Sequence, residues 1–137
     1  MWKLYALLSA LFAALTAILA KIGVKNINSN VATAIRTVII LFMSWGIVLL
    51  AGEMKGVKTL TKNNLLFLTL SGIATGLSWL FYFKALQAGP VSKVAPIDKL
   101  SVAIAMALSV ILLGEHLDTK TIIGGLLIVA GSIVIIL

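Results

Sequence analysis

Five long apolar segments dominate this sequence, and they restrict its possible folds more than any other feature. Apolar residues make up 61% of the 137 residues and charged residues only 11%, whereas a soluble domain carries about 25% charged residues. A helix that crosses ~30 Å of hydrocarbon needs about 20 mostly apolar residues. The pattern therefore predicts an all-α integral membrane bundle of five transmembrane helices, at about residues 4–22, 31–51, 65–88, 91–113 and 120–137.

The segments between the expected spans are short and polar, and the longest is the lysine-bearing loop Gly52–Asn64. Connections of a few residues join helices that are antiparallel neighbours. We therefore expect residues 1–137 to form a single five-helix transmembrane domain. Side-chain oxygens at these turns can cap the following helix: Ser29 or Asn30 is expected to cap the second span, and Asp118 or Thr119 the fifth.

Several classes of protein are disfavoured by what the sequence lacks. There is no cysteine and only one histidine, His116, in a turn, so no thiolate site, Ser/His/Asp set or metal cluster is legible. We expect neither an enzyme nor a bound cofactor or metal. A net charge of +7 would suggest nucleic-acid binding in a soluble protein. Here the lysines lie mostly at span ends, where anionic lipid head groups are their expected partners and nucleic acid is not.

The basic residues give the chain little preference for one orientation. Five spans place the termini on opposite sides, and loops rich in Lys and Arg stay in the cytoplasm. With the N-terminus inside, the basic residues divide five inside to six outside, or five to three without the in-span Arg36, Lys84 and Lys99. The inside set is Lys3, Lys55, Lys58, Lys62 and Lys120. So weak a bias predicts that the chain inserts into the membrane in both orientations. Two copies of opposite orientation would then form an antiparallel homodimer.

The fourth span contains charges that should be costly in a membrane. Leu100–Leu113 is a run of 14 residues without charge, about 21 Å long and too short to cross a bilayer. The helix must therefore extend back past Asp98 and Lys99, which places both below the membrane surface. Ionisable groups at such depth are candidates for function. Pro96 weakens the helix just before them and can leave a carbonyl free to bind something.

Four further residues of the second and third spans join this set. Arg36 falls about one turn inside the second span, and Lys84 about one turn from the end of the third. Trp79 and Tyr82 combine apolar rings with polar tips that suit a wet site. Two structural alternatives remain: Lys84, like Lys21 and Lys93, can extend its ammonium to the head groups, and Asp98 can pair with Arg36 or Lys84. The candidate substrate-binding or coupling residues are Asp98, Lys99, Arg36, Lys84, Trp79 and Tyr82.

Several local motifs resemble the repeat unit of EamA-like proteins of the drug/metabolite transporter superfamily. They are the stretch Ala85–Pro96, the turn Leu113–Leu117, the glycine-rich last span, the pair Ala20–Lys21 and the triplet Ala34–Arg36. The string Pro96–Ser101 is similar to one found in the five-span bacterial and archaeal branch. The similarity covers nearly the whole chain and lies in the order and spacing of the motifs.

This resemblance implies an architecture and a function. Most of the family has ten spans built from two units in inverted orientation, so one unit implies an antiparallel homodimer with a midplane site and alternating access. We expect a secondary transporter of a small metabolite in the cytoplasmic membrane, with Asp98 as a candidate coupling carboxylate. The excess of in-span cations favours an anionic or zwitterionic solute. A non-transporting scaffold or accessory subunit is the alternative, and a channel is disfavoured because no selectivity filter is legible.

Overall fold

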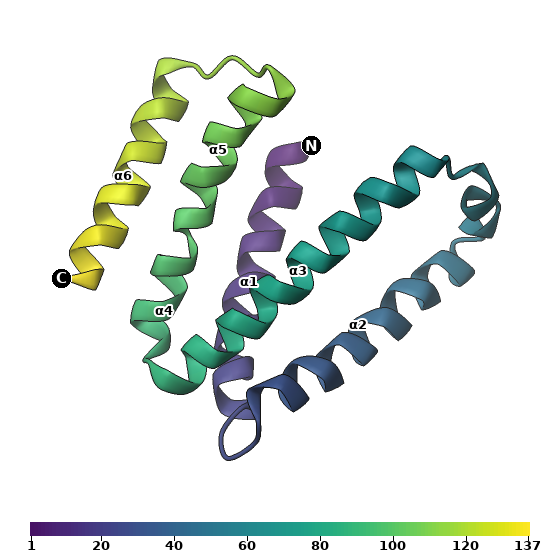
Figure 1. Ribbon diagram of the computed structural model, residues 1–137, viewed down its shortest axis with the longest axis horizontal. Helices are drawn as coiled ribbons and strands as arrows, with labels where there is room; N and C mark the ends of the chain where they lie inside the picture. The colour runs from purple at the N-terminus through teal and green to yellow at the C-terminus, as the bar shows by residue number, and fades with distance from the viewer. The chain divides into compact units, whose positions relative to one another are not determined.

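The computed structural model describes residues 1–137 and contains helices but no β-strand (Figure 1). Five helical stretches are long and apolar enough to cross a membrane, which confirms the predicted all-α class with five spans. The fourth stretch consists of two helices, α4 and α5. The elements are α1 (Trp2–Gly23), α2 (Ser29–Leu50), the 3-10 helix η1 (Glu53–Thr59), α3 (Lys62–Ala88), α4 (Val91–Asp98), α5 (Leu100–Leu113) and α6 (Thr119–Ile136).

Polar side chains fix the start of two helices. Asp118 caps α6 as predicted, and its carboxylate accepts hydrogen bonds from the Thr121 hydroxyl and from the Thr121 backbone N–H at 3.1 Å. These bonds, that of the hydroxyl first, hold the pKa of Asp118 below its ordinary value. The prediction for α2 is wrong, because Asn28 is the cap and its Oδ1 accepts from the Asn30 N–H at 2.8 Å. Ser29 is already the first residue of that helix.

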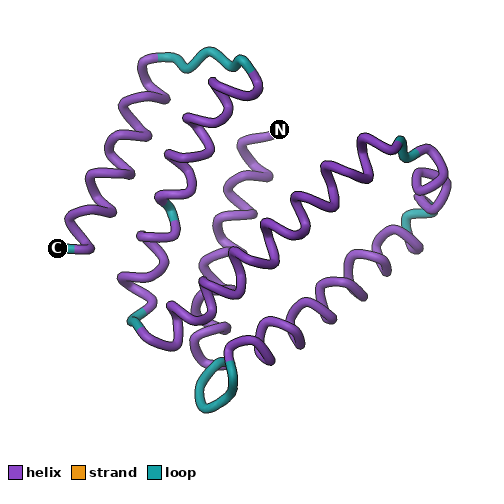
Figure 2. The backbone as a smooth tube through the Cα atoms, in the orientation of Figure 1, coloured by secondary structure: helices purple, strands orange, loops and turns teal.

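The long loop between the second and third spans is more ordered than expected. Gly52 ends α2 in the left-handed region, at φ +70°, which suits a residue without a side chain. The 3-10 helix η1 follows, and α3 begins at Lys62, inside the segment expected to be a loop. Figure 2 shows that only short stretches of non-helical backbone remain on either side of η1.

The fourth span is interrupted at Lys99, three residues beyond Pro96. The Lys99 N–H donates to the Pro96 carbonyl at 3.1 Å, a tight turn that ends α4 before α5 begins at Leu100. The same carbonyl accepts a second hydrogen bond, from the buried Ser132 hydroxyl of α6 at 3.0 Å. The Pro96 carbonyl at this interruption is therefore already hydrogen-bonded by helix α6.

The chain forms two compact units. The first contains residues 1–18 and 88–137, and in it α6 lies against both α4 and α5 (Figure 1). Gly125 of α6 has too little space for a side chain, because a Cβ there would stand 2.7 Å from Met106 Cε on α5. The second contains residues 19–87. Its core is a small cluster of Val24, Ala32 and Phe83, with Ala20 and Tyr82 packed against it.

Most large apolar side chains face outward along every span. Phe42 is 72% exposed and Ile111 is 74% exposed, although both lie within apolar helices. Water would disfavour so much apolar surface. Lipid tails provide the environment in which such helices are stable, because each helix satisfies its own backbone hydrogen bonds.

Candidate functional site

Arg36 lies over aromatic rings within the second unit. Its guanidinium carbon is 4.3 Å from the centroid of the Trp79 ring and 5.5 Å from that of Phe83. Both aromatic residues belong to α3, four positions apart, and therefore share one face of that helix. Distances below about 6 Å give a favourable cation–π interaction. Helices α2 and α3 thus hold a permanent positive charge against an aromatic surface.

This charge lies well inside an apolar helix. Arg36 is seven positions beyond Ser29, where α2 begins, or about 10 Å along the helix axis. An arginine at the centre of a transmembrane helix costs about 2.5–3.5 kcal/mol, and a cation–π contact returns about 0.5–2 kcal/mol. The aromatic contact therefore offsets only part of the cost, and a polar or negatively charged neighbour is needed for the rest.

No carboxylate of the second unit supplies that neighbour. Glu53 is the one acidic residue between positions 19 and 87, and it lies at the far end of α2. The guanidinium of Arg36 also donates no hydrogen bond to a protein acceptor, whereas Thr33 and Thr37 beside it donate to backbone carbonyls of their own helix at 2.9 and 2.8 Å. Arg36 is thus a cation whose donors are not used by its own unit.

The other two candidates of this unit have different surroundings. Tyr82 packs against the cluster of Val24, Ala32 and Phe83. It directly precedes Phe83 in the chain. Lys84 is exposed and forms no salt bridge. Its surroundings fit a lysine that reaches the head groups from near the end of α3.

A contact that the sequence did not predict joins α1 to the end of α3. The Lys21 ammonium donates to the backbone carbonyl of Leu86, a residue that is fully buried. Four residues further on stands Pro90, which has no N–H to offer this carbonyl. Lys21 therefore completes the hydrogen bonding of a helix end, where its charge also interacts favourably with the helix dipole. We had expected this ammonium to reach the head groups.

Gln87 adds a second link at the same end of the unit. Its side-chain amide donates to the carbonyls of Val24, at 3.0 Å, and Ile27, at 2.5 Å. These carbonyls belong to the turn between α1 and α2, where no helix supplies their partners. Sequence reasoning missed Gln87 because a single glutamine near a helix end carries no pattern. The missing N–H of Pro90 was the one available sign that a side chain must satisfy the end of α3.

Asp98 and Lys99 lie in the first unit, at the interruption between α4 and α5. The Lys99 ammonium is 3.4 Å from the Asp98 carboxylate, and their side chains are 53% and 36% exposed respectively. The partner of Asp98 in the structure is thus its neighbour in sequence. The six candidates are divided between the units: Arg36, Trp79, Tyr82 and Lys84 in the second, Asp98 and Lys99 in the first.

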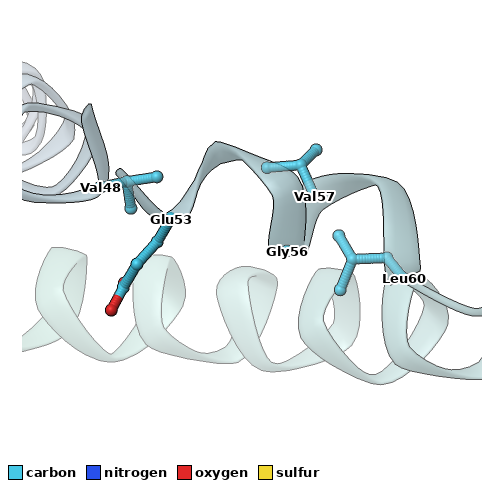
Figure 3. A pocket seen from close by; sticks show the side chains of 5 residues that line it. All are labelled: Val48, Glu53, Gly56, Val57 and Leu60. Atoms are coloured by element: carbon cyan, nitrogen blue, oxygen red, sulfur yellow. The ribbon is translucent and has the colours of Figure 1, made fainter. Parts of the chain in front are cut away.

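A pocket of about 480 Å³ lies elsewhere, where α2 ends and η1 begins (Figure 3). It is lined mainly by apolar side chains, with Glu53 as its one charged residue. None of the six candidate residues contributes to it, so the pocket is separate from the candidate site. The lining residues are Val48, Glu53, Gly56, Val57 and Leu60. No group of three His, Cys, Asp or Glu side chains lies close enough together to hold a metal ion.

Comparison with known proteins confirms the resemblance seen in the sequence. The profile described as the EamA-like transporter family matches residues 1–137. The chain belongs to the EamA-like transporter family. A protein from Sinorhizobium sp., described as "Uncharacterized transporter in cobO 3'region", is 47% identical over 134 residues, which cover 98% of this chain and 95% of that protein. No solved structure matches the chain.

Family and fold together establish a broad function. With its five membrane-spanning helices, this EamA-like protein is a multi-pass membrane protein of a transporter family. Transport moves a solute and does not transform it chemically, which agrees with the expectation that the chain is not an enzyme.

Proposed function

We propose that this EamA-like protein is a secondary transporter of a small anionic or zwitterionic metabolite. The observation that carries the proposal is Arg36, a permanent cation inside α2 that rests on Trp79 and has no carboxylate partner in its own unit. A charge in a span marks a pathway or site for a solute. An anionic group on that solute would supply the neutralisation that the second unit lacks.

We further propose that two copies act as an antiparallel homodimer in the cytoplasmic membrane. Transporters with inverted repeats place their site near the midplane, between two units of opposite orientation. One copy of this chain supplies five spans, and its basic residues are nearly balanced between the two sides. Two oppositely inserted copies would provide both repeats, and rocking of one against the other would give alternating access.

Asp98 is the proposed coupling group. A carboxylate in low dielectric favours its neutral form, whereas a nearby ammonium favours its charged form. At the α4–α5 interruption, Asp98 is half-buried beside Lys99. A carboxylate at this place in a span is the kind of group that carries a coupled proton in transporters.

The antiparallel dimer is tested by labelling single cysteines from each side of the membrane. The chain contains no cysteine, so Lys58→Cys in η1 and Lys25→Cys at the α1–α2 turn would each carry a unique thiol. We expect a membrane-impermeant maleimide to label each position from both sides in comparable amounts. Labelling of Lys58→Cys from one side only, with Lys25→Cys labelled only from the other, would show a fixed orientation and exclude the antiparallel pair.

A further inference from the structure

We propose that Arg36 binds a carboxylate group of the transported solute, and that Trp79 holds the guanidinium in the orientation this requires. This inference rests on the proposed transport function and deepens it by naming the chemical group recognised. It also gives Trp79 a distinct role, that of a positioning residue that acts through Arg36.

The contact with the aromatic rings leaves the N–H donors of Arg36 available to bind a solute. A guanidinium is planar, and its N–H groups point outward in that plane. The centroid of the Trp79 ring lies 4.3 Å from the guanidinium carbon, and the centroid of the Phe83 ring lies 5.5 Å from it. The rings lie over the guanidinium carbon and restrict where the group can move, while no hydrogen bond to the protein occupies its N–H donors. Two parallel N–H donors of a guanidinium match the two oxygens of a carboxylate.

Several polar side chains of the same unit differ from Arg36 in their partners. Thr33 and Thr37 donate to backbone carbonyls of α2, Lys21 to the carbonyl of Leu86, and Gln87 to two carbonyls of the α1–α2 turn. These side chains satisfy the protein's own backbone. Arg36 instead lies over aromatic rings and donates no hydrogen bond to the protein, although groups inside a membrane helix normally find hydrogen-bond partners.

Charge balance favours a carboxylate over a phosphate. Arg36 offers one positive charge, and its guanidinium lies over the rings of Trp79 and Phe83 without an ion-pair partner. A carboxylate carries one negative charge and forms a neutral pair with it. A phosphate monoester carries nearly two at neutral pH, so one charge would remain uncompensated in a low-dielectric site. The remainder of the solute would lie against aromatic surface.

The test uses the emission of Trp79 as a direct reporter. Trp2→Phe and Trp45→Phe leave Trp79 as the one tryptophan in purified, detergent-solubilised protein. A panel of small monocarboxylates and amino acids is titrated against it, each compared with its primary amide and with an alkyl phosphate of similar length. We expect at least one carboxylate to change Trp79 emission saturably, and its amide and the phosphate to be at least about tenfold weaker, as for loss of a charge-assisted hydrogen bond.

Variants of Arg36 make the assignment specific. Arg36→Lys keeps the charge but loses the paired donors, so the bound carboxylate should be held about tenfold more weakly; Arg36→Gln should abolish binding. Trp79→Phe, measured by competition in the transport assay, should raise the half-saturating concentration more than it lowers the maximal flux. Circular dichroism checks that each variant is folded, and the carboxylate–amide comparison in the Arg36-containing protein needs no variant of Arg36.

Each contrary result has a defined meaning. The inference is overturned if no carboxylate changes Trp79 emission, if an amide or phosphate binds as well, or if folded Arg36→Gln binds the carboxylate normally. Saturable transport of a solute without a carboxylate, with Trp79 emission unchanged, would overturn the inference and leave the transporter proposal standing. Carboxylate binding that depends on Arg36, without any flux, would contradict the transporter proposal alone.

Discussion

Replacing Asp98 by Asn should abolish the dependence of transport on a pH gradient while leaving the protein folded. An amide cannot take up and release the proton that the coupling role assigns to this side chain. The ion pair that is lost, with Lys99 at 3.4 Å, joins two residues adjacent in the chain, so its loss does not separate any two helices. In proteoliposomes, the pH-driven component of uptake should fall at least about tenfold, whereas exchange of solute between the two sides should persist.

A carboxylate outside the spans provides the matched control. Glu115→Gln removes a charge from the turn between α5 and α6, and it should leave both driven uptake and exchange unchanged. Folding of Asp98→Asn is verified by its elution and thermal unfolding in detergent. A folded Asp98→Asn protein that still transports with the original pH dependence would remove Asp98 from the coupling mechanism.

The second large effect is expected at Gly125, where α6 meets α5. A Cβ at this position would lie 2.7 Å from Met106 Cε and 3.0 Å from Met106 Sδ. Gly125→Ala should be tolerated, because the flexible end of Met106 can move. Gly125→Leu requires more space than that movement yields, and overpacking of this kind costs about 1–3 kcal/mol. Thermal unfolding of the detergent-solubilised protein measures this loss of stability.

A substitution at another glycine of α6 shows whether any loss of stability comes from crowding or from a change in helix propensity. Gly131 has no neighbour within 4 Å of its added Cβ, so Gly131→Leu changes propensity alone and should not destabilise the unit. Adding Met106→Ala to Gly125→Leu should recover most of the lost stability, since it removes the atoms that clash. Equal stability of the two leucine variants would show that α5 and α6 do not pack through Gly125.

The sequence predicts the spans well because hydropathy is a local property. Each apolar run is long enough to require a helix in lipid, whatever its neighbours are, and five such helices are present. The residues at which helices begin and end are harder to predict. Asn28, Ser29 and Asn30 all carry side chains able to cap α2, and the backbone path of the turn selects Asn28. Asp118 was predictable because it stands directly before an apolar run in which the helix must start.

Tertiary contacts of the candidate site were not predictable in the same way. Arg36 and Trp79 lie on different helices, and nothing in their spacing shows that one stacks on the other. Lys21 looked like one more lysine at a span end, but a proline four residues beyond Leu86 gives it a carbonyl to bind. Depth in the membrane identified Arg36 and Asp98 as unusual, whereas only the fold shows which side chains surround each of them.

Whether the protein is a transporter is decided by measuring transport with the purified wild-type protein. The protein is reconstituted into liposomes, and uptake of a radiolabelled carboxylate-bearing solute, chosen as the strongest ligand of the fluorescence panel, is followed against the same unlabelled solute inside. We expect saturable uptake well above that of protein-free liposomes, and loss of this uptake in Arg36→Gln. Uptake no greater than in protein-free liposomes, by folded protein that binds the solute, would contradict the account and favour a scaffold or accessory subunit.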